Sequence, residues 1–214
     1  MQNRSEKPFI LMADRSFNSV RELMKPLELA LEASRPILVV ANDVEGDALQ
    51  GLVLNRVKGS LQVAAIKSPG FGGARHDLLL DLESIVGGKV IDSAFDMTSF
   101  EPDMFGTCKK IIIHKSKTLV IKEEARTEQT QERMDSIKER LQYPGLTENE
   151  TELLKYRIQQ LSGGIAILRV GAATESELIE RYDRVDDALH ATRAALQEGV
   201  LPGGGIALHR LANE

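Results

Sequence analysis

Residues 36–66 read PILVVANDVEGDALQGLVLNRVKGSLQVAAI, and this stretch decides the fold. The run ILVVA follows a proline and contains no polar residue, which is typical of a strand that is covered on both faces. A helix is predicted from about Asp47 to Lys58, and a second strand is predicted at 61–66. A strand, a helix and a strand in this order indicate a parallel β–α–β unit.

The same alternation continues on both sides of this unit. The further expected elements are a strand at 9–13, a helix at 20–33, a helix at 76–86 and a short strand at 89–91. Ser19 and Glu22 have the spacing of a capping box, which predicts the start of the 20–33 helix. The apolar residues of that helix form one narrow stripe of Val20, Leu23, Met24, Leu27 and Leu31. Periodicity alone therefore predicts a plain core helix.

The pattern changes after residue 108. Two apolar runs at 109–115 and 118–123 suggest a β-hairpin, although Ser-Lys is not a strong turn pair. Two charged helices follow, joined by PGLTENE at 144–150, with apolar stripes at Met134, Ile137 and Leu141, and at Leu154, Ile158 and Leu161. They predict an antiparallel helical hairpin that projects partly into solvent. A strand at 165–170 and a long helix at 175–198 are expected to complete the pattern.

Composition narrows the class of protein. The 214 residues carry a net charge of −5, which gives no support for binding nucleic acid or an anionic membrane. The apolar runs have the length of strands and fall short of the roughly 20 residues that a membrane span needs. The single cysteine, Cys108, excludes an internal disulfide and fits a reducing compartment, and the four histidines are too scattered for a metal motif. These features predict a cytosolic globular protein without a metal site.

Two glycine-rich stretches could bind an anion. KSPGFGGARHD at 67–77 follows a predicted strand and precedes a helix, the context of an anion at a helix N-terminus; a plain connecting loop is the alternative. PGGG at 202–205 lacks the Gly-Lys-Ser/Thr of a P-loop and also fits a helix end followed by a loop. Asp187 and His190 share a helix face, where a solvated ion pair is expected.

The helix at 47–58 has an unusually wide apolar arc. Leu49, Leu52, Val53, Leu54 and Val57 span roughly 200°, whereas one buried face needs about 100°. Either two neighbouring elements cover this helix, or part of its apolar surface is exposed for binding.

Five segments resemble the group I chaperonins, the bacterial GroEL family, in the right order and spacing. They are PFILMAD, VVANDVEGDALQGLVLN, VAAIKSPGFG, LSGGIAILRVGAATE and DALHATRAALQEGV with the following PGGG. The resemblance runs from about Pro8 to the C-terminus. It implies an α/β fold like that of the chaperonin apical domain, with β/α layers and a protruding antiparallel helical hairpin, followed by a partial, mainly helical intermediate segment. It divides the chain into an apical domain (1–164), a returning intermediate segment (165–198) and the incomplete start of a second equatorial half (199–214).

The resemblance also implies roles for individual residues. The groove that binds non-native polypeptides and the co-chaperonin's mobile loop corresponds to Met24, Leu27, Leu49, Val53, Leu54 and Asn55. Gly163 and Gly164 correspond to the hinge between the apical and intermediate domains. Asp187 matches the carboxylate that orients the water attacking ATP, and Gly204 matches backbone that packs against the nucleotide.

The function that the resemblance implies is that of a molecular chaperone, which assists ATP-dependent folding as part of a complete subunit. Complete members bind ATP and magnesium. No stretch here matches the family's Gly-Asp-Gly-Thr loop, so we expect this chain alone to bind neither well and not to be an enzyme. Family rings have seven subunits, but this chain is expected to be monomeric. The resemblance implies a bacterial-type cytoplasm, with an organelle matrix as the alternative.

Two other functions remain open at this point. One is a self-contained nucleotide-binding enzyme that uses Asp187 and the PGGG loop. The other is a paralogue that has lost chaperone activity.

Overall fold

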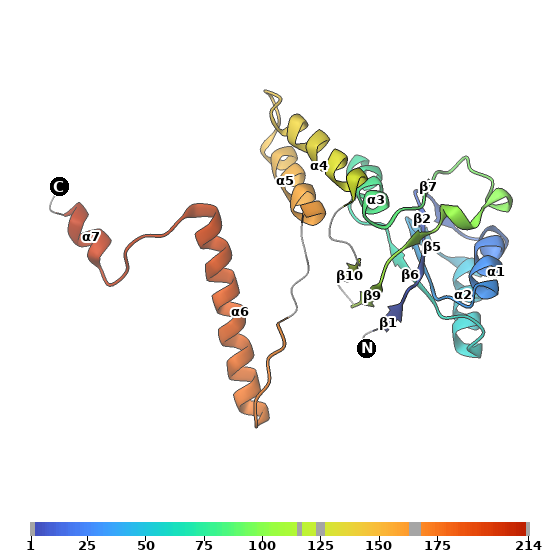
Figure 1. Cartoon of the computed structure of the whole chain (residues 1–214), viewed down its shortest axis with the longest axis horizontal. Helices are drawn as coiled ribbons and strands as arrows, with labels where there is room; N and C mark the ends of the chain where they lie inside the picture. The colour runs from blue at the N-terminus through green and yellow to red at the C-terminus, as the bar shows by residue number, and fades with distance from the viewer. Residues whose placement is uncertain (1–2, 115–116, 123–126, 163–167, 213–214) are drawn as a thin grey trace. The chain divides into compact units, whose positions relative to one another are not determined.

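The computed structural model describes residues 3–114, 117–122, 127–162 and 168–212 (Figure 1). The chain divides into two compact units, Met1–Ile165 and Ala166–Glu214. The predicted hinge residues Gly163 and Gly164 lie outside the described residues. The division lies one residue from the boundary expected after Gly164, and the assignment of the units to apical and intermediate domains stays a prediction.

A mostly parallel sheet forms the centre of the first unit. Its strands are β2 (Phe9–Ala13), β4 (Ile37–Ala41), β6 (Val63–Lys67), β7 (Val90–Ile91) and β8 (Gly106–Thr107). The order is β6-β4-β2-β7, and the short β8 pairs antiparallel with the start of β2. Together, β4, α2 (Gly46–Lys58) and β6 confirm the predicted β–α–β unit, with β4 and β6 in parallel register from Ile37–Val63 to Ala41–Lys67.

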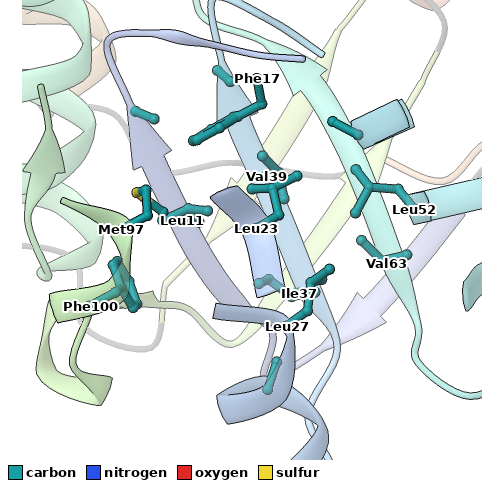
Figure 2. Close-up of a cluster of buried hydrophobic side chains, with 14 of the residues drawn as sticks. Leu11, Phe17, Leu23, Leu27, Ile37, Val39, Leu52, Val63, Met97 and Phe100 are labelled. Atoms are coloured by element: carbon teal, nitrogen blue, oxygen red, sulfur yellow. The ribbon is translucent and has the colours of Figure 1, made fainter. Parts of the chain in front are cut away.

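Both faces of the sheet are covered, as the run ILVVA predicts. All five residues of β4 are buried, and alternate side chains enter different apolar clusters. Ile37 and Val39 pack in the cluster under η1 (Val20–Leu23), α1 (Met24–Glu32) and α2, which Figure 2 shows with Leu23, Leu27 and Leu52. The short helices η2 (Met97–Ser99) and η3 (Pro102–Met104) close the same side.

The opposite face of the sheet packs against α3 (Gly73–Val86) and a second, antiparallel sheet. That sheet has the order β1-β9-β10, with β1 at Asn3–Glu6, β9 at Lys110–Ile113 and β10 at Thr118–Ile121. The predicted hairpin of β9 and β10 is therefore present. Figure 1 shows α1 and α2 on one side of the central sheet and α3 on the other. A two-stranded parallel pair, β3 (Ser16–Phe17) with β5 (Asp43–Val44), precedes η1 and α2.

The predicted helical hairpin consists of α4 (Glu128–Leu141) and α5 (Glu148–Ser162). It has its own apolar cluster of Met134, Ile137, Leu154 and Leu161. Thr147 and Glu150 form the expected capping box: Glu150 accepts from the Thr147 backbone N–H at 2.9 Å, and Thr147 Oγ1 accepts from the Glu150 N–H at 3.3 Å. The hairpin also packs against α3, which the sequence did not indicate.

The second unit contains α6 (Glu175–Glu198) and α7 (Ile206–Leu211). The helix predicted at 175–198 is confirmed. The strand expected at 165–170 is not present at 168–170, and 165–167 lie outside the described residues. An isolated extended segment has no neighbouring strand to accept its ladder hydrogen bonds, so apolar composition alone does not make it a strand.

The stripe predicted on the first helix is partly wrong. Leu23 and Leu27 are buried as expected, but Met24 and Leu31 are exposed, while Leu29 packs partly against the core. Leu23, Pro26, Leu27 and Ala30 are buried at ordinary helical spacing. The buried face therefore includes the proline and the small Ala30, which the stripe of large apolar residues left out, and it turns Met24 and Leu31 towards solvent.

Candidate functional site

An exposed apolar surface lies on α1 and α2. It consists of six large apolar residues, each between 45% and 78% exposed to solvent. Its members are Met24, Leu31, Leu49, Val53, Leu54 and Val57, and we call this set the α1–α2 surface. An isolated exposed leucine is ordinary, but six large apolar residues on two helices of one unit form a candidate interaction surface.

The wide apolar arc of α2 explains most of this surface. Only Ala48 and Leu52 of the helix are buried, and they face the central sheet. The rest of the arc is only partly covered, since Leu49, Val53 and Leu54 are 45%, 53% and 53% exposed. Of the two alternatives left open by the sequence, the structure therefore favours an exposed apolar face.

Gly51 brings α2 close to the 3₁₀ turn that leads into α1. A Cβ atom placed on Gly51 would lie 2.5 Å from Val20 Cγ2, which is closer than side chains normally approach. The neighbouring Asn55 donates its amide N–H to the Gly51 carbonyl at 2.9 Å, so its side chain folds against its own helix. Gly51 thus holds α2 close to the turn that leads into α1.

The six residues expected in the polypeptide groove do not all have the same environment. Met24, Leu49, Val53 and Leu54 are exposed. Leu27 is only 8% exposed and belongs to the core cluster with Leu23, so it supports the surface from beneath. Leu31 and Val57 extend the exposed area beyond the expected set. The wide arc of α2 already signalled Val57, whereas Leu31 was assigned to the buried stripe.

The residues expected to act on a nucleotide lie in the second unit. Asp187 is exposed in the middle of α6. His190 pairs with Asp186 rather than with Asp187, at 3.6 Å between Nδ1 and Oδ2. Gly204 has a φ of +65°, which favours glycine, and a Cβ there would meet no atom within 4 Å. In the parts of the chain that the structure describes, no group of three or more His, Cys, Asp or Glu side chains is arranged to hold a metal ion.

The glycine-rich stretch at 67–77 forms the loop between β6 and α3, together with the first turn of α3. Gly70 and Gly72 have φ values of +79° and +57°, so their backbone conformations favour glycine. His76, in the first turn of α3, lies 2.9 Å from Asp14 through Nδ1 and Oδ2. The contact thus joins the first turn of α3 to the residue that follows β2. The glycines of the loop allow its turn.

Cys108 is not arranged for thiol chemistry. Burial raises the pKa of the Cys108 thiol to about 11, against smaller opposing effects of the Lys110 backbone and the charge of Arg35. The thiolate is the reactive form of cysteine, so this side chain is protonated and unreactive at neutral pH. No helix of the described residues combines the length and apolar character needed to cross a membrane.

Comparison with known proteins finds a family model and a solved structure that match most of this chain. The model of the TCP-1/cpn60 chaperonin family matches residues 12–214. The fold is similar to the crystal structure of the chaperonin gp146 from the bacteriophage EL 2 (Pseudomonas aeruginosa), determined in the presence of ATP-BeFx. The TM-score is 0.70 at 20% sequence identity, and the match covers 97% of this chain and 41% of that chain. The chain therefore spans about two fifths of the length of that protein.

Proposed function

This chain belongs to the TCP-1/cpn60 chaperonin family, and from this premise we propose that its first unit binds non-native polypeptides through the α1–α2 surface. The observation that carries the proposal is the exposure of large apolar side chains on α1 and α2, among them Leu49, Val53 and Leu54 on α2. Non-native chains expose apolar segments, and such segments gain free energy by leaving water.

The size of the surface suits weak and promiscuous binding. Burial of about 300 Å² of apolar surface at roughly 25 cal/mol/Å² contributes on the order of 7 kcal/mol before the entropic costs of association. Met24 adapts its shape more easily than branched side chains, which favours varied partners. Net affinity at one isolated site is therefore low, and several sites presented together would bind far more tightly.

In a complete subunit, residues 1–164 would form the apical domain, 165–198 an intermediate segment and 199–214 the start of an equatorial half. The same surface would accept the mobile loop of a co-chaperonin, and Gly163 and Gly164 would act as the hinge. Asp187 and Gly204 would contribute to a site for ATP and magnesium, with Asp187 orienting the attacking water. Assembly into seven-subunit rings and a location in the bacterial-type cytoplasm or an organelle matrix belong to the same proposal.

The test is polypeptide binding by a variant in which Leu49, Val53 and Leu54 are all replaced by serine. Fluorescence anisotropy with a labelled amphipathic peptide should show binding to the wild-type chain and at least a tenfold loss in the variant. Tyr156→Ser is the matched control, because Tyr156 is also exposed but lies on α5. Equal binding by the wild type and the serine variant would overturn the proposal and favour a paralogue without chaperone activity.

A further inference from the structure

A buried charge network joins α3 to the α4–α5 hairpin. Arg157 on α5 donates from Nε to Asp81 Oδ2 at 2.6 Å and from Nη2 to Asp81 Oδ1 at 2.9 Å. The Arg157 side chain is 3% exposed and that of Asp81 is 6% exposed. Two parallel hydrogen bonds between a guanidinium and a carboxylate form one of the strongest and most directional polar contacts in proteins.

The same carboxylate also binds the other helix of the hairpin. Arg133 on α4 donates from Nε to Asp81 Oδ1 at 2.8 Å. Asp77, one turn before Asp81 on α3, accepts from Arg157 Nη1 at 2.9 Å and lies 3.4 Å from Arg133 Nη2. Asp81 therefore connects three helices, and Asp77 reinforces both arginines.

Other contacts between the hairpin and α3 are also largely polar. The hydroxyls of Thr127 and Thr130 both donate to the Ser84 carbonyl, at 3.3 and 2.7 Å. The apolar cluster of the hairpin is made by its own residues, to which α3 adds the partly buried Ile85 within the described part of the chain. The hairpin thus has its own small core, and its contacts with α3 include a buried charge network.

The stability of a buried charge pair depends on whether one partner or both partners are removed. Removal of one charge from a buried pair is strongly destabilising, whereas removal of both charges is often tolerated. Loss of Asp81 would leave the buried Arg157 with Asp77 as its remaining carboxylate partner in this network. Among the described residues, none of α4 or α5 belongs to the two apolar clusters on either side of the central sheet, and Ile85 of α3 packs against both the sheet cluster and the hairpin cluster. Loss of the network should therefore loosen the hairpin without loosening the sheet.

We propose that Asp81 is a positioning residue that docks the α4–α5 hairpin on α3, and that the hairpin opens as a unit separate from the central sheet. This role is independent of polypeptide binding by the α1–α2 surface. It concerns the position of the hairpin alone.

Hydrogen exchange on the full 214-residue chain tests the proposal. In the Asp81→Asn variant, amides of α4 and α5 should exchange at least tenfold faster, while amides of β4 should keep their wild-type rates. Asp135→Asn is the matched control, because Asp135 lies on α4 in an exposed pair with Lys138 at 2.8 Å. This control should change the same amides by less than about twofold, since exposed pairs contribute little.

A double variant separates docking from general damage to the fold. Asp81→Leu combined with Arg157→Leu removes both buried charges and leaves Arg133 with Asp77. It should restore at least part of the protection that Asp81→Asn loses. The proposal is overturned if Asp81→Asn accelerates exchange in β4 as much as in α4 and α5, if it leaves the hairpin protected, or if the double variant recovers nothing.

Discussion

Gly51 and Val20 set the distance between α2 and the 3₁₀ turn before α1. A methyl group at position 51 would lie 2.5 Å from Val20 Cγ2, so the present spacing of the two helical segments requires glycine. Glycine is otherwise a poor residue within a helix, about 1 kcal/mol worse than alanine. The close approach of α2 to the turn that leads into α1 outweighs that local cost.

Gly51→Ala should therefore destabilise the first unit in spite of its better helix propensity. The β-branched Val20 is stiff, and overpacking of this kind costs about 1–3 kcal/mol. We expect the free energy of unfolding, measured by urea denaturation, to fall by about 1 kcal/mol. Val20→Ala in the same chain should recover most of the loss, and a Gly51→Ala variant as stable as wild type would contradict the tight contact.

Neighbouring residues on α2 should respond very differently to truncation. Leu52 is 4% exposed and Val53 is 53% exposed. We expect Leu52→Ala to lower the free energy of unfolding by about 2–5 kcal/mol through the cavity it leaves. Val53→Ala should change it by no more than about 0.5 kcal/mol but should weaken peptide binding. Equal costs at the two positions would mean that Val53 is buried in solution.

The chain by itself should not hydrolyse ATP. Asp187 can orient a water only if the γ-phosphate and its metal are held nearby, because positioning supplies much of phosphoryl-transfer catalysis. No stretch of the sequence matches the family's phosphate-binding loop. A steady-state assay should give the same background rate for wild type and Asp187→Ala. Turnover that disappears in the variant would support the self-contained enzyme instead.

Cys108 should react slowly with alkylating agents. Burial raises the pKa of its thiol to about 11, so at pH 8 very little thiolate is present in the folded chain. Because the folded pKa lies above the ordinary value of about 9, the thiol favours the native state below pH 9 and loses that effect as the pH rises towards 11. The rate at which iodoacetamide alkylates Cys108 at pH 8, measured by mass spectrometry, should rise with urea concentration in parallel with the unfolded fraction. Rapid labelling without denaturant would show that the thiol is accessible.

The chain should sediment as a single subunit. The resemblance to the group I chaperonins implies that ring contacts lie largely in the equatorial domain, and we expect only residues 199–214 to correspond to that domain. Sedimentation velocity over a range of concentrations should give one species of constant size. A stable seven-subunit particle would contradict the expectation and would place ring contacts in the described units.

The sequence by itself determined the longer helices, the main strands of the central sheet and the kind of fold. The continuous apolar run ILVVA at 37–41, between turn residues, is typical of a strand inside a covered parallel sheet. The capping residues Ser19 and Thr147 mark helix starts locally. The wide apolar arc of α2 could also be predicted from the sequence. Its leucine and valine residues span a wider arc of the helix than one buried face needs.

Only the tertiary structure decided which of those apolar residues face water and which charges meet. Pro26 and Ala30 lie on the buried face of α1 with Leu27, so Met24 and Leu31 are surface residues while Leu27 is in the core. Asp81 meets Arg133 and Arg157 across 52 and 76 residues of sequence. Local periodicity fixes the faces of a helix, but the neighbour that covers each face depends on the packing of segments far apart in the chain.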